Sequence, residues 1–353
     1  MTELRIAVLG VGMMGAFHVD ALTKRIRGAK VTVISDYFPE KAKEVADAIG
    51  ARVVDDPIEA INDAEVDAVL IASPGAVHDV QVNACLDAGK PVLCEKPLTT
   101  DIASSRVIVE KEKSLGKELI QVGFMRRFDP EYVALHQLIV SGGLGNPLMV
   151  HCTHRNPAVP DHFNSEFMIR DSVVHEVDVT RFLLGEEIVS VQVIKGVATS
   201  AAPAGTNDPM LVVFETESGR IVTDEIYVRT GVAYEVRTEV VGEQGSATIG
   251  LDQNLQVKRT DGSWGGQITP GFVERFGQAY DIELQRWVDA AKQGTIDGPG
   301  AWDGYAAVAV CEAGVKAVRS GRKEYVQLAG IALPVEEEPI PDIRAPDLIG
   351  DRP

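Results

Sequence analysis

The stretch LRIAVLGVGMMG, residues 4–15, decides how this chain folds. Six mostly apolar residues predict a short strand, which runs directly into Gly10, Gly12 and Gly15. In a strand–turn–helix unit the first glycine allows a tight turn, and the second lets a pyrophosphate approach the backbone. The third lets the helix pack closely against the strand, and the helix N-terminus offers N–H groups to the phosphates. The stretch therefore predicts a dinucleotide-binding unit.

An acidic residue supports this prediction and narrows the choice of dinucleotide. Asp36 ends the second predicted strand, 21 residues after Gly15. A carboxylate at that place can accept hydrogen bonds from both ribose hydroxyls of an adenosine, and it repels a 2′-phosphate. The next two residues are aromatic, so no arginine follows to neutralise such a phosphate. We expect NAD as the cofactor, with Met13 and Met14 of the glycine loop among its contacts.

Residues 1–124 alternate short, continuously apolar segments with helical patterns. Strands are predicted at 4–9, 30–35, 52–54, 68–72, 92–94 and 119–122. Helices are predicted between them, at 15–24, 39–49, 78–88 and 101–115. Buried strands that alternate with helices indicate a parallel sheet covered on both faces, and right-handed crossovers make it doubly wound. The fold class is α/β, with an N-terminal Rossmann domain.

The pattern changes at about residue 125. Longer segments follow, several of which alternate polar with apolar residues, at 148–152, 189–197, 210–215, 219–229, 234–242 and 245–249. They predict an open, mostly antiparallel sheet with one face on a core, followed by helices at 273–293 and 301–320. We therefore expect a Rossmann domain (1–124), an α+β domain for substrate binding and oligomerisation (125–330), and a Pro- and acid-rich C-terminal arm or tail (331–353).

The composition excludes several classes of function. The formal net charge of -18 argues against nucleic acid and anionic membranes as partners. No apolar run reaches the roughly 18 residues of a membrane span, and we expect no signal peptide, because the first residues lead straight into a strand. The four cysteines form no CxxC pair, so we expect a cytoplasmic protein without disulfides or a metal site.

Two groups of polar residues are candidates for the chemistry. Lys96 belongs to the triplet Glu95-Lys96-Pro97 after the fifth strand, where ligands of doubly wound sheets bind. Asp171 and His175 lie four residues apart, which places both on one face of a helix. A carboxylate beside a buried imidazole can orient the ring and raise its proton affinity, as a general base for alcohol oxidation requires. The alternatives are a surface lysine and a satisfied core histidine.

These motifs together resemble the Gfo/Idh/MocA family (glucose–fructose oxidoreductase, inositol dehydrogenase, rhizopine catabolism) over about residues 4–328. The similarity rests on the glycine loop, Asp36, ASP at 72–74 with His78, the EKP triplet, the DxxxH pair, and YDIELQRW at 280–287. The resemblance implies an NAD-dependent oxidoreductase whose catalytic residues are Lys96, Asp171 and His175. It also implies further cofactor contacts from Ser73, Pro74, His78, Glu95 and Lys96. For His78, a structural role at a helix start is an equal alternative.

Within the family, the segments GFMRRFDP at 123–130 and HRN at 154–156 are most similar to members that oxidise inositols. The resemblance implies oxidation of one secondary alcohol of a cyclic polyol, with myo-inositol giving 2-keto-myo-inositol. It implies substrate contacts from Arg126, Arg127, His154, Asn156, Asp171, His175 and Tyr234. It also implies a homodimer or homotetramer, since an open apolar sheet face needs cover.

Other interpretations stay open on the sequence alone. The same catalytic residues could oxidise scyllo-inositol, a pyranose or an anhydrosugar. Glycosidase-type chemistry with tightly held NAD occurs in the broad family. A non-catalytic NAD-sensing regulator is a further alternative, although the intact Lys96, Asp171 and His175 argue against it.

Overall fold

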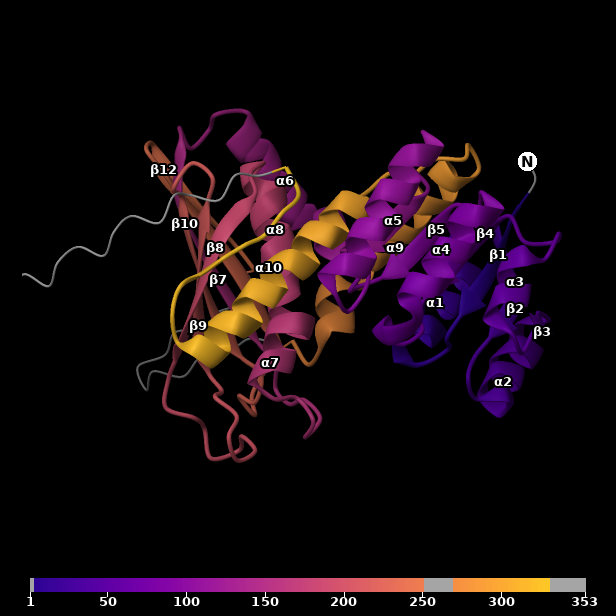
Figure 1. Ribbon diagram of the computed structural model, residues 1–353, viewed down its shortest axis with the longest axis horizontal. Helices are drawn as coiled ribbons and strands as arrows, with labels where there is room; N and C mark the ends of the chain where they lie inside the picture. Colours follow the sequence, from indigo (N-terminus) through magenta and orange to yellow (C-terminus); the bar gives the residue numbers. More distant parts are fainter. Residues whose placement is uncertain (1–2, 251–268, 331–353) are drawn as a thin grey trace, which may run out of the picture.

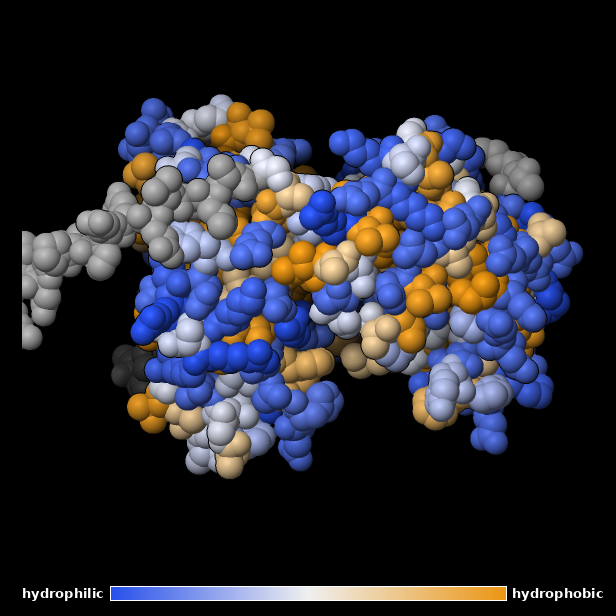
Figure 2. Space-filling model, in the orientation of Figure 1, coloured by the Kyte–Doolittle hydropathy of each residue, from blue (hydrophilic) through white to orange (hydrophobic). Residues whose placement is uncertain are grey.

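The computed structural model describes residues 3–250 and 269–330, and these form two lobes (Figure 1). The C-terminal arm or tail predicted for residues 331–353 lies outside the described residues. Within the described residues, no helix combines the length and apolar character that crossing a bilayer requires. Hydrophilic residues predominate over both lobes on the face that Figure 2 shows.

A six-stranded parallel sheet forms the centre of the first lobe, in the order β3-β2-β1-β4-β5-β6. Its strands are β1 (Leu4–Leu9), β2 (Ala29–Ser35), β3 (Arg52–Val53), β4 (Ala68–Ile71), β5 (Val92–Glu95) and β6 (Ile120–Gly123). Strands β4, β5 and β6 are buried at every position, as continuous apolar runs require. The strand order reverses between β1 and β4, and this switch point is where such sheets open a ligand crevice. The predicted Rossmann fold is confirmed.

Helices cover both faces of this sheet, and one of them comes from the far end of the chain. The first five are α1 (Met13–Lys24), α2 (Pro39–Ile49), α3 (Pro57–Asn62), α4 (His78–Ala88) and α5 (Ile102–Leu115). Helix α9 (Phe272–Ala291) packs Leu284, Trp287 and Val288 into the core formed by β1, β2 and α1. A helix from the predicted second domain therefore covers part of the first lobe.

The second lobe is built on a seven-stranded sheet in the order β12-β11-β7-β10-β9-β8-β13. Its strands are β7 (Pro147–Arg155), β8 (Ile188–Lys195), β9 (Met210–Thr216), β10 (Ile221–Tyr227), β11 (Glu235–Gly242), β12 (Gly245–Ile249) and β13 (Glu324–Tyr325). All neighbours are antiparallel except β7 and β10, which pair in parallel. The prediction of a mostly antiparallel sheet is confirmed, with this one exception.

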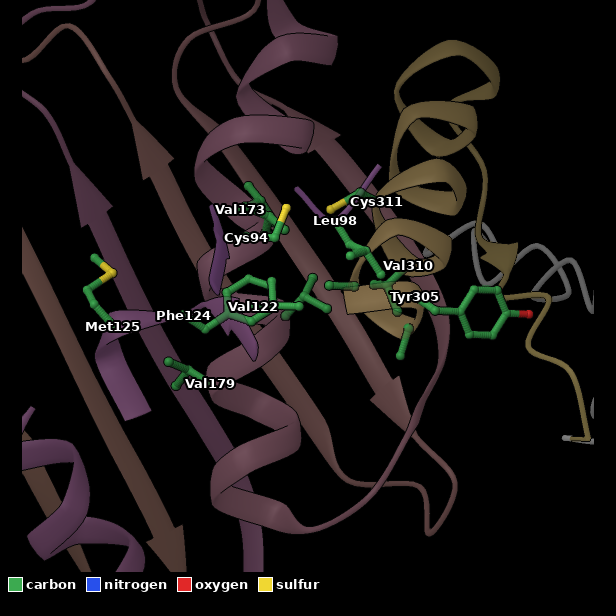
Figure 3. Close-up of a cluster of buried hydrophobic side chains, with 14 of the residues drawn as sticks. Cys94, Leu98, Val122, Phe124, Met125, Val173, Val179, Tyr305, Val310 and Cys311 are labelled. Carbon is green, nitrogen blue, oxygen red and sulfur yellow. The ribbon is translucent and has the colours of Figure 1, made fainter. Parts of the chain in front are cut away.

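Helical segments lie against this sheet and connect it to the first lobe. They are α6 (Pro130–Val140), α7 (Ser165–Phe167), a π-helical turn (Met168–Val173), α8 (Val174–Leu184) and α10 (Ala301–Ser320). Helix α10 packs on β8 of the second lobe and on α5 of the first (Figure 1). The two lobes share one hydrophobic core, in which Cys94 and Val122 lie with Val173 and Cys311 (Figure 3). This core holds the end of β5 against the π-helical turn.

Candidate active site

A cavity of about 670 Å³ opens at the carboxyl ends of β1, β2 and β4. Most of the predicted cofactor residues of the first lobe line it: Gly10, Gly12, Met13, Met14, Asp36, Ser73 and Pro74. Gly15 lies beneath the same loop, in the first turn of α1. The predicted dinucleotide site is thus one continuous hollow along the switch point of the sheet.

The three glycines of the loop are glycines for different physical reasons. Gly10 has a φ of +84°, and a Cβ there would lie 2.6 Å from the backbone nitrogen of Ser73. A Cβ on Gly15 would lie 1.9 Å from the carbonyl oxygen of Gly10. A Cβ on Gly12 would meet nothing within 4 Å, and α1 starts directly after it without a side-chain cap. Internal packing therefore explains Gly10 and Gly15, whereas the open space and uncapped N–H groups at Gly12 fit a bound pyrophosphate.

Asp36 joins the glycine loop to the end of β2. Its Oδ2 accepts a hydrogen bond from the backbone N–H of Val11 at 2.6 Å, and its Oδ1 accepts one from Phe38 at 2.8 Å. Carboxylate oxygens can each accept more than one bond, so the ribose hydroxyls of an adenosine can still be bound. Tyr37, which is 90% exposed, and Phe38 line the same cavity beside the carboxylate.

His78 lies behind the cavity wall instead of lining it. Its Nδ1 is 2.8 Å from the carbonyl oxygen of Pro97, and its Nε2 is 2.8 Å from that of Ser73. The ring is buried at the start of α4 and ties the loop after β4 to the loop after β5. This position fits the structural role that the sequence left open, because both ring nitrogens are already used by the protein.

A second cavity of about 460 Å³ lies between the lobes and adjoins the first, since Met13 and Met14 line both. Besides these two methionines, seven predicted site residues meet here: Glu95, Lys96, His154, Asn156, Asp171, His175 and Tyr234. They come from the end of β5, the end of β7, the π-helical turn, α8 and the segment before β11. Residues up to 139 positions apart in the chain thus face one space at the end of the dinucleotide cavity.

An ion pair across the lobes forms one side of this cavity. The Lys96 Nζ donates to Asp171 Oδ1 at 2.8 Å and to the Asp171 carbonyl oxygen at 2.9 Å. On the preceding residue, Glu95 Oε1 lies 2.7 Å from Nε2 of the buried His18, and Glu95 Oε2 accepts from the Lys96 backbone N–H. The backbone N–H and the side-chain ammonium of Lys96 are therefore both held by hydrogen bonds, and the ammonium group points at the second lobe.

The relation between Asp171 and His175 differs from the prediction. Asp171 lies in the π-helical turn and His175 in α8, so the simple i to i+4 geometry of an α-helix does not apply. Among the hydrogen bonds of the described residues, none joins the two side chains, and the Asp171 carboxylate accepts from Lys96 instead. Burial, followed by the positive charges of Arg126 and Lys96, lowers the pKa of His175 well below its ordinary value. The expectation that Asp171 raises the proton affinity of His175 is wrong for this arrangement.

The two predicted substrate arginines point into the protein interior. They lie in the 3₁₀ turn η2 (Met125–Phe128), which turns both side chains toward buried carboxylates of α8. Arg126 pairs with Glu176, and Arg127 donates to Asp178 at 2.7 Å. Neither guanidinium is part of the cavity lining, which corrects the expectation that these arginines contact substrate directly. Local sequence could not reveal this, because the carboxylates lie about fifty residues further along.

Several cavity residues with no role assigned from the sequence complete the lining. Met125, Ser172 and Tyr280 line the same space as Lys96 and His175. Tyr280 is part of the YDIELQRW segment and Ser172 lies beside Asp171. The sequence therefore marked both regions, but it did not show that these side chains face the cavity. Burial, with the nearby Glu95, raises the pKa of Tyr280 well above its ordinary value, so its hydroxyl keeps its proton.

Comparison with known proteins agrees with this arrangement of two lobes around one site. A family model described as "Oxidoreductase family, NAD-binding Rossmann fold" matches residues 4–124. Its companion, "Oxidoreductase family, C-terminal alpha/beta domain", matches residues 136–328. The chain belongs to the Gfo/Idh/MocA oxidoreductase family. The predicted family and the predicted NAD-dependent oxidoreductase class are confirmed, and the NAD cofactor agrees with the family description.

Two curated relatives carry the same name. The chain is 63% identical over 332 residues to an inositol 2-dehydrogenase from Rhodococcus erythropolis, which covers 92% of this chain and 96% of the relative. It is 60% identical over 331 residues to an inositol 2-dehydrogenase from Mycolicibacterium gilvum, with 93% and 95% covered.

Solved structures share the whole fold. The crystal structure of myo-inositol dehydrogenase from Lactobacillus casei, in complex with NAD(H) and myo-inositol, matches with a TM-score of 0.89 and 31% identity. The match covers 94% of this chain and 99% of that one. A scyllo-inositol dehydrogenase from the same organism, with bound NAD(H) and scyllo-inositol, matches with a TM-score of 0.84 and 25% identity, covering 92% and 99%.

Proposed function

We propose that this protein oxidises the 2-hydroxyl group of myo-inositol to a ketone, with NAD as the hydride acceptor. The observation that carries the proposal is the meeting of Lys96, Asp171 and His175 in the cavity that adjoins the dinucleotide cavity. The inositol 2-dehydrogenases that are 60% and 63% identical to this chain support the same substrate.

His175 is the group that accepts the hydroxyl proton. Its lowered pKa keeps the ring neutral, so a lone pair is ready at neutral pH. Among the described residues, no hydrogen bond ties either ring nitrogen of His175 to another residue, which leaves the ring free to bind substrate. A neutral base needs no prior proton loss before the reaction begins.

Lys96 and Asp171 act on the oxygen that is being oxidised. The Lys96 ammonium donates to that oxygen and stabilises the negative charge that develops on it. The Asp171 carboxylate orients the ammonium through the 2.8 Å bond across the lobes. The nicotinamide of bound NAD supplies the hydride acceptor, and the protein contributes position and charge.

The remaining cavity residues recognise the other hydroxyls of the ring. His154, Asn156, Tyr234, Ser172 and Tyr280 offer hydrogen-bonding groups on several sides of the space. Asn156 Oδ1 is enclosed without a partner among the described residues, whereas its Nδ2 is not enclosed and can donate to a ring hydroxyl. A polyol that satisfies several such groups binds better than one that lacks a hydroxyl, because unpaired buried groups are costly.

A substrate panel tests the proposal and its alternatives together. Purified protein is assayed with NAD and myo-inositol, scyllo-inositol, glucose, xylose or levoglucosan, and reduced nicotinamide is followed by its absorbance. We expect the highest kcat/KM for myo-inositol. Preference for scyllo-inositol or a sugar would replace the substrate assignment, and inactivity with the whole panel would reject it. NAD retained through desalting, together with turnover of a nitrophenyl glycoside, would instead favour glycosidase-type chemistry.

We also propose that the protein works as a cytoplasmic homodimer or homotetramer, with the second lobe supplying the contact. The open seven-stranded sheet supports self-association, because its outer positions include Leu148, Leu211 and Ile221, which are at least 37% exposed. Light scattering of the purified protein should give a mass of two or four chains. A monomer at micromolar concentration would contradict the assignment.

The four buried free cysteines support a reducing compartment, which fractionation of the source cells would test.

A further inference from the structure

We propose that Glu176 is a positioning residue that fixes His154 as a hydrogen-bond acceptor toward a substrate hydroxyl. This rests on the proposed function for the nature of the substrate, but the state of the His154 ring is a separate claim. Glu176 is 1% exposed and does not line the cavity, so it acts through His154 and not by contact with the polyol.

The contacts of one ring nitrogen carry the inference. His154 Nδ1 lies 3.1 Å from Glu176 Oε2, and at a longer 3.4 Å from Arg126 Nη2. Glu176 is a carboxylate: burial alone would raise its pKa, but Arg126 and His154 outweigh burial and lower the pKa to about 2. A carboxylate only accepts hydrogen bonds, so Nδ1 must carry the hydrogen that lies between them. In a neutral ring, Nε2 is then the acceptor.

The second ring nitrogen faces the cavity. His154 is buried and lines the cavity, yet Nε2 has no partner among the described residues and is not enclosed. The open nitrogen is therefore the one that a ligand can reach. Arg126 already balances the charge of Glu176.

Among the buried groups around His154, Glu176 carries the negative charge. Asp224 on β10 has both oxygens enclosed without a partner among the described residues, and burial together with Glu176 raises its pKa well above the ordinary value. This shift favours the protonated form of Asp224. Arg126 only donates, so it holds Glu176 Oε1 and leaves Oε2 to face the ring.

A neighbouring pair on the same helix provides a matched control. Asp178 is as buried as Glu176 and is paired with Arg127, the residue next to Arg126. The Arg127–Asp178 pair continues to Asp303, and within the described residues it is hydrogen-bonded to no residue of the cavity lining. Removing the charge of either carboxylate disturbs a buried arginine–carboxylate ion pair, but only Glu176 is hydrogen-bonded to a residue that lines the cavity.

The Glu176→Gln substitution makes a specific prediction for the ring. Because Arg126 only donates, the amide oxygen of the new side chain stays on Arg126, and its NH₂ group takes the place of Oε2. That group donates to Nδ1, so the hydrogen of His154 moves to Nε2. We expect ¹⁵N NMR of histidine-labelled protein at pH 8, assigned with His154→Ala, to show the Nδ1–H tautomer in the wild type. We expect the Nε2–H tautomer in Glu176→Gln and the wild-type pattern in Asp178→Asn.

A double-mutant cycle measures whether the hydrogen bond between Glu176 and His154 contributes to substrate binding. Glu176→Gln should raise the KM for myo-inositol about 10-fold while kcat changes by less than about threefold, since His154 does not take the proton. In the His154→Ala background the same change should leave KM unaltered. Asp178→Asn should keep the wild-type KM and lower only the Tm.

The outcomes separate the two proposals. A charged ring or an Nε2–H ring for His154 in the wild type would overturn the role of Glu176, whether or not the enzyme is active and whether or not the variants fold. Equal KM effects with and without His154 would overturn it as well. A wild type that oxidises no cyclic polyol would reject the proposed function instead, and the NMR result would still decide the tautomer.

Discussion

The two adjoining cavities of this protein are built by different means. The dinucleotide cavity is formed largely by backbone: a glycine loop, the uncapped start of α1, and one carboxylate held by two N–H groups. The cavity between the lobes is formed by side chains from both lobes, whose charges are set by partners such as Lys96 with Asp171. A backbone site leaves its signature in one short stretch, whereas a side-chain site depends on pairs far apart in the chain.

The largest effect should come from removing the ammonium group between the lobes. Lys96→Ala should lower kcat by about 10²–10⁴-fold, because charge on the reacting oxygen loses its partner. NAD binding, measured by fluorescence or calorimetry, should remain. Lys117→Ala, at an exposed position of the same lobe, is the control and should behave as wild type. Near-normal turnover in Lys96→Ala would remove the lysine from the mechanism.

Asp36→Ser should affect only the dinucleotide cavity. We expect the KM for NAD to rise about 10- to 100-fold, since hydrogen bonds to a charged acceptor are lost, and discrimination against NADP to relax. The KM for the polyol at saturating NAD should stay near wild type. An unchanged ratio of kcat/KM for NAD and NADP would mean that the carboxylate serves only to hold Val11 and Phe38.

Two alanine substitutions separate packing from ligand approach within one loop. Gly15→Ala should destabilise the protein without ligand by about 1–3 kcal/mol, because its Cβ would overlap the carbonyl of Gly10. Gly12→Ala should leave the Tm without ligand unchanged but weaken NAD binding about 10-fold, because only the ligand needs that space. Thermal unfolding with and without NAD measures both. Equal losses of Tm without ligand would show that Gly12 is also required by packing.

The smallest effect expected is a shift in the pH profile. His175 works as a base only when neutral, so activity is lost as pH falls through its pKa. Because that pKa is lowered, the acid limb of kcat/KM should have its midpoint below the ordinary histidine value of about 6.5. His151→Gln, at a half-buried histidine bonded to Thr223, should not move this limb. A midpoint above 6.5 would contradict the neutral-base assignment.

The sequence predicted the dinucleotide cavity better than the cavity between the lobes. The first is built largely from one contiguous stretch, whereas the second depends on side chains far apart in the chain. The GVGMMG loop and Asp36 predicted the fold and cofactor of the first lobe, since strand, turn and helix are contiguous.

Long-range features could not be predicted in this way. The side chains of Arg126 and Arg127 are turned inward by carboxylates about fifty residues away. The π-helical turn at Asp171 was also hidden, because a spacing of four between Asp171 and His175 is what an α-helix would show. The parallel pairing of β7 with β10 leaves no mark in the alternation of either strand. The direction in which a side chain points depends on its interaction partners, and a local sequence pattern does not show which residues those are.

Transfer of an isotope from substrate to cofactor tests the central claim most directly. One turnover of myo-inositol deuterated at C2 with NAD should give reduced cofactor that carries one deuterium, detected by mass spectrometry, and a slower reaction than with unlabelled substrate. Reduced cofactor without deuterium, or no reduction of NAD at all, would contradict oxidation of that carbon at the meeting point of Lys96, Asp171 and His175.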